Sequence, residues 1–464
     1  MSAPVQARAH ERAPAPPGDP LVGHALRLRR VGQLAYNLDN WRRLGDVVRL
    51  RLGPFVVHMV AHPVHIQHVL IANRQTYGRG RGYAVLRLLT GQGLLTSEGP
   101  VWQRQRRLMQ PPFTPKAVPQ YAGAMTAATQ ALLERWERRA ADAGRAPASI
   151  DINAEMLSLA LDVIGRTMFS QALERQSQEL VAAFAAAVPI VGDRITAALD
   201  LPLALPTPAN RRLRQALRTL DRRMYALIAE RRRQGSGAGA GSPDLLARLL
   251  EARDPETGAA MSRRQVRDEV VTIFFAGHET IAQTLTWAWY LLAQHLEAEE
   301  QLHAELAQVL AGRAPTVAEL PRLRYTRMVL AETLRLYPAV WAIPRGAVAD
   351  DEIGGYAIPA GSLVFPFTYA AHRHPEVWSE PERFDPGRFA PEASTERPPC
   401  SYVPFGAGSR ACIGQTFAVQ EAMIVLALVA QRYRLRVAPG QLIVPHSAIT
   451  LGPRDGLHMT LQRC

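Results

Sequence analysis

The residues around Cys412 combine a metal-binding side chain with an unusually open backbone. The stretch from Phe405 to Gly414 reads Phe-Gly-Ala-Gly-Ser-Arg-Ala-Cys-Ile-Gly. Its three glycines permit turns and a close approach that a side chain would block. A helix is predicted from Gln415 to Gln431, so Cys412 lies just before a helix N-terminus, where the dipole and the free amide groups favour a thiolate. The predicted chemistry is thiolate ligation of the metal in a flat cofactor.

An inert buried thiol is the usual role of a lone cysteine, and we keep that interpretation for Cys400 and Cys464. Neither has the glycines and the arginine that surround Cys412. These three cysteines in 464 residues cannot form a disulfide framework, which is typical of a reducing compartment. We therefore expect a cytoplasmic protein in which only Cys412 needs a chemical explanation.

A second candidate site is the pentapeptide Ala276-Gly277-His278-Glu279-Thr280 within a predicted helix. A glycine inside a helix costs about 1 kcal/mol relative to alanine, so Gly277 needs a reason. The Thr280 hydroxyl can donate a hydrogen bond to the carbonyl of Ala276, which bends the helix and opens a groove. A helical threonine beside a surface glutamate is also common without any chemistry. We interpret His278 as a bystander and not as a ligand.

Glu332 and Arg335, in Glu-Thr-Leu-Arg, lie three residues apart and therefore share one face of a predicted helix. Most such pairs are solvated and contribute only about 0.2 to 0.5 kcal/mol. The pair is therefore informative about function only through its position relative to the other motifs.

Taken in order, these motifs resemble those of the cytochrome P-450 family. The cysteine stretch matches the family's haem-binding loop, Phe-Gly-x-Gly-x-Arg-x-Cys-x-Gly, at every fixed position. The resemblance implies a b-type haem whose axial ligand is the Cys412 thiolate, which favours cleavage of the O–O bond of dioxygen. It also implies haem contacts from Phe405, Gly406, Arg410 and Gly414.

The resemblance assigns catalytic roles to residues of the pentapeptide. Glu279 and Thr280 match the acid–alcohol pair that delivers protons during oxygen activation in this family, and Ala276 and Gly277 form the groove beside them. Ile281 replaces the second threonine often found after this pair, which leaves Thr280 itself in place.

The resemblance also implies a buried Glu-Arg-Arg cluster beneath the haem loop. Pro381-Glu382-Arg383-Phe384 follows Glu332 and Arg335 at the family's usual interval, and Arg383 is expected to complete the cluster. A buried cluster of this kind fixes structure and does no chemistry.

Haem propionates attract arginine and amphipathic donors. The resemblance assigns this role to Trp102, Arg106 and Arg345 besides Arg410, although Arg345 has the alternative of an ordinary surface arginine. Apolar substrate contacts are expected from Leu86, Leu94, Phe275, Ala276, Val340, Ile343 and Ile449.

Helices are the main elements that must position these residues. From Val101 to about Arg233 the apolar pattern predicts helices with breaks at Pro111 and Pro112, near Gly192, and at the apolar stretch Leu201 to Pro208, which is either a lid or an ordinary connection. A long helix begins at Ser262, which forms a capping box with Gln265, and ends near His295 after roughly 50 Å.

A helix is also predicted from Tyr325 to Tyr337, and the segment around Ser362 to Phe367 is strand-like. Alternating residues from Val47 to Val60 predict a hairpin that turns at Gly53-Pro54. We expect a mainly α fold with a small β component: one cytochrome P-450 type domain over residues 21–464, a long central helix that crosses the haem, and a small sheet near the N-terminus.

Two segments are expected to be irregular. Residues 1–20 are rich in proline and alanine and are predicted to be a mobile or extended leader. Gly235 to Ser242 is predicted to be a loop, although its composition also suits a domain linker. No secretory segment and no apolar span of about 20 residues is found, so a transmembrane anchor is not expected.

The net charge of +13 is almost entirely due to arginine, since Lys116 is the only lysine, which suggests a GC-rich bacterial genome. No nucleic-acid motif accompanies this charge, so we favour an acidic protein partner. The chain has no flavin or ferredoxin segment. We therefore expect electrons from NAD(P)H to arrive through a separate ferredoxin or flavodoxin and its reductase, docking near Arg104 and Arg107 of a monomeric enzyme.

The expected function is that of a haem-thiolate monooxygenase, which hydroxylates or epoxidises a lipophilic molecule such as a fatty acyl, terpenoid, steroid or polyketide compound. Apolar pockets discriminate weakly among such substrates. The alternatives are a peroxygenase or isomerase that needs no external electrons, and a sensor that binds a ligand without turnover. Glu279 and Thr280 favour the monooxygenase, because a proton-delivery pair is needed chiefly when dioxygen is cleaved.

Overall fold

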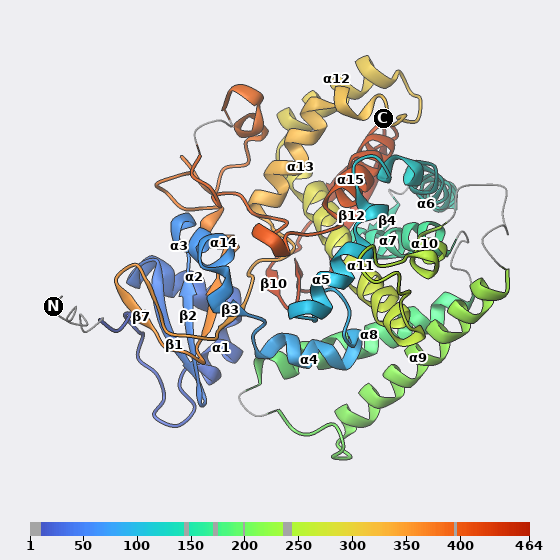
Figure 1. Cartoon of the computed structure of the whole chain (residues 1–464). Coiled ribbons are helices and arrows are strands. Elements are labelled where there is room, and N and C mark those ends of the chain that lie inside the picture. Colours follow the sequence, from blue (N-terminus) through green and yellow to red (C-terminus); the bar gives the residue numbers. More distant parts are fainter. Residues whose placement is uncertain (1–10, 143–147, 170–174, 198–199, 235–243, 394–396) are drawn as a thin grey trace, which may run out of the picture.

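The computed structural model describes residues 11–142, 148–169, 175–197, 200–234, 244–393 and 397–464 (Figure 1). The predicted loop from Gly235 to Ser242 and the first ten residues of the predicted leader lie outside this part of the chain. The α-helices are α1 (Ala25–Val31), α2 (Gln33–Leu44), α3 (Pro63–Gln67), α4 (Arg81–Thr90), α5 (Gly99–Met109), α6 (Ala122–Asp142), α7 (Ile152–Phe169), α8 (Arg175–Thr196), α9 (Pro208–Gln234), α10 (Leu245–Glu251), α11 (Arg263–Gln294), α12 (Leu296–Leu310), α13 (Arg324–Leu336), α14 (Thr368–Ala371) and α15 (Gln415–Ala430).

The strands are short by comparison. They are β1 (Val47–Leu52), β2 (Phe55–Val60), β3 (Tyr77–Gly78), β4 (Ser149–Asp151), β5 (Arg345–Ala347), β6 (Asp351–Ile353), β7 (Tyr356–Ile358), β8 (Leu363–Pro366), β9 (Tyr433–Val437), β10 (Pro445–Ser447), β11 (Leu451–Pro453) and β12 (His458–Arg463). The largest sheet has the order β1-β2-β8-β5-β3 and lies at the N-terminal side of the molecule (Figure 1). The mainly α class with a small sheet is therefore confirmed.

The hairpin predicted around Gly53-Pro54 is confirmed. Strands β1 and β2 pair antiparallel, with Leu52 opposite Phe55 and Val47 opposite Val60. Strand β8 then pairs parallel to β2, which places the segment after α13 beside the N-terminal hairpin. Residues 11–20 also join this region, because Glu11 bridges to Tyr356 and the carbonyl of Pro14 accepts a hydrogen bond from the Arg49 amide at 2.8 Å. The packed chain thus begins before Leu21.

Helix α11 runs through the body of the molecule (Figure 1) and packs against α7, α9, α13 and α15. Ser262 caps it, and the side chains of Ser262 and Gln265 form the predicted capping box. At 1.5 Å per residue its 32 residues span about 48 Å. Buried residues lie all around it, as in a helix surrounded by other elements.

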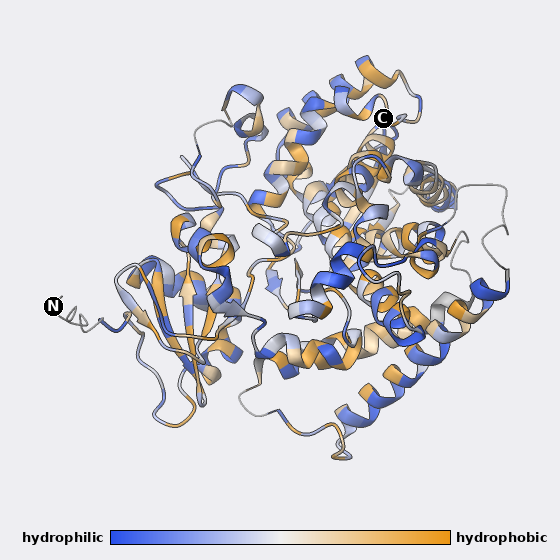
Figure 2. Cartoon of the chain, in the orientation of Figure 1, coloured by the Kyte–Doolittle hydropathy of each residue, from blue (hydrophilic) through white to orange (hydrophobic). Residues whose placement is uncertain are grey.

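Helix α8 corrects one predicted boundary. The break expected near Gly192 is wrong, because α8 continues through Pro189 and Gly192 to Thr196. Buried apolar residues on either side of Pro189, Ala187 and Val191, hold the helix against its neighbours, so tertiary packing offsets the lost backbone hydrogen bond. Its partner α9 alternates hydrophilic and hydrophobic turns (Figure 2), as a helix with one buried face does.

Two large apolar cores support the site. One joins α6, α7, α11, α13 and α15, and the other joins α4, α8, α9, α10 and α11, so both include the long helix. The helices on either side of residues 235–243 pack into the same core, as expected for a loop within one domain. Among the described residues, no helix is both long enough and apolar enough to span a membrane.

Candidate functional site

A cavity of about 320 Å³ lies between α11, the start of α15 and the loop that precedes α15. Its wall includes Cys412 from the loop and Ala276, Gly277 and Thr280 from α11. The two motif groups, more than a hundred residues apart in sequence, therefore share one space. The apolar part of the wall comes from Leu94, Leu95, Phe113, Ile164, Met168, Leu245, Ile273, Ile281, Leu330, Leu334, Val340, Ile343, Ile413 and Phe417.

The loop before α15 folds back on itself around Cys412. The Cys412 amide donates a hydrogen bond to the carbonyl of Phe405 at 2.8 Å, which closes the loop. Gly406 and Gly408 have positive φ angles of 72° and 68°, which L-residues rarely adopt. A Cβ at Gly408 would also lie 2.4 Å from the carbonyl oxygen of Leu70, so a side chain is excluded there. These glycines hold the cysteine against the cavity.

The Cys412 thiol faces the cavity, so its accessible surface lies against this interior space. Burial raises the pKa of the Cys412 thiol, while the Gly414 amide, which donates a hydrogen bond to it, and the charge of Arg106 act in the opposite direction. The amide at the start of α15 and Arg106 therefore favour the predicted thiolate, while burial disfavours it. A metal cation bound to sulfur deprotonates a thiol outright.

Positively charged side chains gather at one part of the cavity wall. Arg79, Arg345 and Arg410 line it together with Trp102, whose ring lies 3.9 Å from the Arg410 guanidinium carbon. Burial and the neighbouring arginines lower the pKa of Arg410 to about 9. The nearby carboxylate Glu98 is a single negative charge against three arginines.

This excess of buried positive charge requires anionic partners. The Arg79 Nε is buried and finds no hydrogen-bond partner within the described chain. Arg345 is only 6% exposed, so the alternative of a surface arginine is wrong. Arg106 also lines the cavity, where its guanidinium donates to the Ala411 carbonyl at 3.0 Å. A thiol facing the cavity, with arginines whose charge is uncompensated, fits an iron porphyrin with two propionates.

The α11 segment has the predicted hydrogen bond. Thr280 Oγ1 donates to the Ala276 carbonyl at 2.7 Å. Gly277 lines the cavity, and its lack of a side chain also allows α7 to pack closely, because a Cβ at this position would lie 3.2 Å from Ile164 Cδ1. His278 Nδ1 lies 2.7 Å from the Phe274 carbonyl, and burial lowers the pKa of His278, as expected for a neutral bystander.

Glu279 does not line the cavity. Its Oε2 is buried and has no hydrogen-bond partner among the described residues. A buried acceptor without a partner is costly, so this oxygen is available to accept a hydrogen bond from a bridging water.

Glu332 and Arg335 form the expected buried pair. Arg335 donates to both Glu332 oxygens at 2.6 and 2.7 Å, and both side chains have no exposed surface. Arg335 also donates to the carbonyls of His372, Pro381 and Arg383, which ties α13 to the segment that leads to the cysteine loop.

The assignment of Arg383 to this cluster is wrong. Its side chain is 62% exposed and pairs with Glu380 at 3.0 Å, and only its backbone carbonyl reaches the cluster. The second arginine is Arg388, whose Nε lies 3.5 Å from Glu332 Oε1 and whose side chain is 9% exposed. The sequence offered a signal, because Pro386-Gly387-Arg388-Phe389 nearly repeats Pro381-Glu382-Arg383-Phe384.

The predicted substrate contacts divide into two groups. Leu94, Ala276, Val340 and Ile343 line the cavity. Leu86, Phe275 and Ile449 do not line it; all three pack into or against the core that α4, α8 and α9 share with α11. The stretch from Leu201 to Pro208 also lies off the cavity wall, and Leu201 and Leu205 are exposed.

Several residues of the site were not predicted. Arg79 and Tyr83 join the arginine-rich wall, and the Arg79 guanidinium carbon lies 4.2 Å from the Tyr83 ring centroid. Glu421 of α15 lines the cavity as a buried carboxyl, and burial raises its pKa well above the ordinary value. The only signals in the sequence are the glycines around Arg79 and an acidic residue within the apolar run of α15.

The proposed docking arginines are already paired. Arg104 lies 3.2 Å and Arg107 3.3 Å from Asp254 Oδ2, and Arg107 also lies 2.8 Å from Glu256. Two carboxylates thus match two guanidinium groups, so these arginines add little net charge for steering a partner.

Comparisons with known proteins agree with this geometry. The family model described as Cytochrome P-450 matches residues 14–454. The chain is 38% identical to cyclooctat-9-en-7-ol 5-monooxygenase of Streptomyces melanosporofaciens over 92% of this chain and 90% of that protein. It is 33% identical to pentalenene oxygenase of Streptomyces avermitilis over 94% of each chain. The crystal structure of the cytochrome P450DA haem domain superimposes with a TM-score of 0.87, 29% identity and 98% coverage of both chains.

Proposed function

The chain belongs to the cytochrome P-450 family and is a monooxygenase, and from this premise we propose that it oxidises a terpenoid in the cavity between Cys412 and Thr280. The observation that carries the proposal is that one cavity holds the cysteine thiol, the bent α11 segment and a continuous apolar wall. Haem, when bound, supplies dioxygen activation: one oxygen atom is inserted into an unactivated bond and the other leaves as water.

We assign the haem contacts to the residues around the cavity. Haem b would be held by the Cys412 thiolate, and Phe405, Gly406 and Gly414 would let the loop approach it closely. Arg79, Trp102, Arg106, Arg345 and Arg410 would bind its propionates, a role that the excess of buried positive charge supports.

We assign proton delivery to Thr280 and Glu279, which would pass protons into the cavity beside Ala276 and Gly277. The Thr280 hydroxyl donates its hydrogen bond to the Ala276 carbonyl at 2.7 Å, so its oxygen lone pairs remain available as acceptors. One residue away, Glu279 has a buried oxygen that finds no partner among the residues that the structure describes. A water that bridges the two side chains would give a proton path to the groove at Ala276 and Gly277.

The names of two relatives support a terpenoid substrate. One relative is named for oxygenation of cyclooctat-9-en-7-ol and the other for oxygenation of pentalenene, so one is named for an alcohol and one for a hydrocarbon. The mostly apolar cavity wall, whose uncharged polar groups include Thr167, Thr272 and Thr284, suits a compact lipophilic molecule with few polar groups. Hydroxylation and epoxidation are both open to such a substrate.

Electrons reach the family's haem from redox partners. We propose a separate ferredoxin or flavodoxin that receives its electrons from NAD(P)H, and a monomeric enzyme in the cytoplasm. Three free cysteines, Cys400, Cys412 and Cys464, support the reducing compartment. Because Arg104 and Arg107 are neutralised by Asp254 and Glu256, docking depends on shape and on other charges more than on these two arginines.

The first experiment is the carbon monoxide difference spectrum of the reduced protein, with Cys412→Ala and the matched control Cys400→Ala. A strongly red-shifted Soret band in the wild type and in Cys400→Ala, absent in Cys412→Ala, is expected for thiolate ligation. Terpenoid hydrocarbons and alcohols are then supplied with NADPH and a surrogate ferredoxin system. NADPH-dependent hydroxylated or epoxidised product supports the monooxygenase proposal, whereas product formed only with peroxide indicates a peroxygenase and binding without product indicates a sensor.

A further inference from the structure

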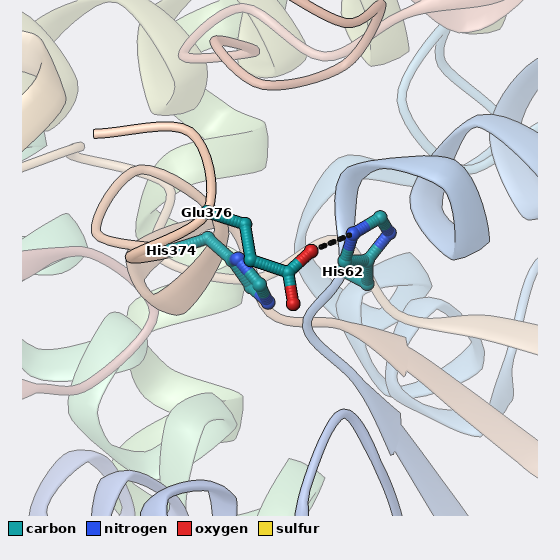
Figure 3. A group of neighbouring side chains, drawn as sticks. All are labelled: His62, His374 and Glu376. Carbon is teal, nitrogen blue, oxygen red and sulfur yellow. Dashed lines mark ion pairs between the residues drawn. The ribbon is translucent and has the colours of Figure 1, made fainter. Parts of the chain in front are cut away.

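Two histidines and a glutamate meet outside the cavity, where β2 ends and α3 begins. His62 is the N-cap of α3, and His374 and Glu376 lie in the turn after α14 (Figure 3). One ligand atom from each side chain lies within 4.8 Å of the other two. None of the three residues lines the cavity described above, so this cluster is separate from the haem site.

The distances between the ligand atoms are somewhat longer than, or similar to, those around a bound zinc ion. His62 Nε2 lies 3.4 Å from Glu376 Oε2, and the rings of His62 and His374 lie 4.8 Å apart, edge to face. Tetrahedral zinc bonds of about 2.0 to 2.1 Å place neighbouring ligand atoms roughly 3.3 Å apart. The His62–Glu376 edge already has this length, and a ring nitrogen of His374 lies within 4.8 Å of both ligand atoms.

His374 is prepared for ligation by a carboxylate behind it. Its Nε2 lies 3.1 Å from Asp46 Oδ1, and because a carboxylate only accepts, this nitrogen carries the proton. The other ring nitrogen, Nδ1, therefore presents a lone pair, and it is buried without a partner within the described chain. Asp46 is fixed in turn by a hydrogen bond from Trp41 Nε1 at 2.8 Å. A carboxylate that orients a ligating histidine in this way is the usual support of a metal site.

The remaining side chains leave room for a cation. Glu376 is 72% exposed and His62 is 22% exposed, so an ion reaches the cluster from solvent. The neighbouring Arg373 turns toward Glu382 at 2.9 Å and toward the ring of Tyr369, which compensates its charge. His62 Nδ1 accepts a hydrogen bond from the Val64 amide at 3.2 Å, and a metal on Nε2 moves the ring proton to Nδ1, so binding gives up this weak cap.

We propose that His62, His374 and Glu376 bind one divalent ion of the zinc class, with water completing the coordination. Two imidazoles and a carboxylate suit zinc and its neighbours better than calcium or magnesium, which prefer oxygen ligands alone. The site joins residue 62 to residue 374, in the two segments that follow the parallel strands β2 and β8 of the largest sheet. The ion would link these two segments and stabilise the fold, because its ligands come together only in the folded chain.

The test is calorimetric titration of the haem-loaded protein with zinc chloride after removal of loosely bound metal with a chelator. Haem loading keeps Cys412 out of the titration. The variants are His374→Ala and Glu376→Gln, with Asp46→Asn as a test of the orienting carboxylate. Controls are His446→Ala, which removes an exposed histidine, and Cys464→Ser, because Cys464 Sγ lies 3.9 Å from His303 Nδ1 and is a competing zinc site. The Soret band of each variant checks that the fold is intact.

One equivalent of zinc with micromolar affinity is expected in the wild type and in both controls. Affinity should fall at least about tenfold in His374→Ala and Glu376→Gln, and about 10 to 100-fold in Asp46→Asn. Zinc should also raise the unfolding temperature of the wild type and not that of His374→Ala. The proposal is overturned if zinc binds only at millimolar concentration, if His374→Ala binds as the wild type does, or if Cys464→Ser abolishes binding.

Discussion

Replacing Arg388 by alanine removes one of the two guanidinium groups that face the buried Glu332 carboxylate. Arg388 Nε lies 3.5 Å from Glu332 Oε1, and its Nη2 also donates to the Glu380 carbonyl at 3.0 Å. Arg383→Ala is the matched control. Arg383 is five residues away and follows the same Pro-x-Arg-Phe pattern, but it pairs with Glu380 in solvent.

The two substitutions should differ several-fold in their effect on the free energy of unfolding. Removing one partner from a buried ion pair costs about 3 to 5 kcal/mol. Glu332 keeps both hydrogen bonds from Arg335 and one from the Asp385 amide, so about 2 to 3 kcal/mol is expected for Arg388→Ala. The exposed Arg383–Glu380 pair contributes at most about 0.5 kcal/mol.

Thermal unfolding of the haem-loaded proteins, followed by far-UV circular dichroism and by the Soret band, measures the difference. At about 2.1 cal/mol/K per residue, a chain of 464 residues has an unfolding entropy of about 1 kcal/mol/K. Arg388→Ala should therefore lower Tm by about 2 to 3 °C, and Arg383→Ala by about 0.5 °C or less. An equal loss in both variants, or a larger loss in Arg383→Ala, would refute the assignment of Arg388 to the cluster.

Three further outcomes are expected. Burial raises the pKa of Glu269 to about 8, so the folded chain keeps a proton that the unfolded chain releases above about pH 4.5. The free energy of unfolding should therefore fall by up to about 4 kcal/mol between pH 5 and 8 because of this group. Urea unfolding of Glu269→Gln should lack this slope. Thr280→Ala should reduce the amount of product formed per NADPH consumed about tenfold or more. Thr286→Ala, which loses a similar hydrogen bond to the Ala282 carbonyl, should not reduce it. An equal yield per NADPH in both variants would exclude a proton-delivery role for Thr280. Arg79→Ala should lose haem to apomyoglobin roughly tenfold faster than the exposed control Arg74→Ala, because a charged hydrogen-bond partner contributes about 1.5 to 3 kcal/mol. Equal rates of haem loss in the two variants would exclude Arg79 from the propionate site.

Features that depend on neighbours in sequence were predictable. The Ser262–Gln265 capping box, the Thr280–Ala276 hydrogen bond and the hairpin at Gly53-Pro54 each involve residues within a few positions of one another, and the structure contains all three. The local backbone determines such contacts, so type and spacing are sufficient to infer them.

Features that depend on the path of a loop were not predictable. Arg383 and Arg388 have nearly the same local sequence, and only the turn at Glu380, with φ of 44°, and the fold beyond it decide which guanidinium faces Glu332. Arg79 reaches the cavity wall from a segment more than 260 residues before Arg345, and nothing in either segment indicates that they meet. Phe275 and Ala276 are adjacent in sequence, yet only Ala276 lines the cavity, because the packing of α4, α8 and α9 fixes the rotation of α11.

The composition of α11 explains how one helix carries residues that weaken it. Its middle holds a glycine at 277 and, at Glu279, a buried carboxylate oxygen that has no partner in the described part of the chain, both of which cost stability. Aromatic contacts on either side offset this cost: Phe274 stacks on Phe184 at 4.8 Å, and Trp287 stacks on Tyr337 at 4.0 Å and donates to the Leu451 carbonyl. Since these contacts flank the pentapeptide, the helix stays in register while its centre remains open to substrate and oxygen. Substitutions at Trp287 should therefore disturb the geometry at Thr280, seven residues earlier in the helix.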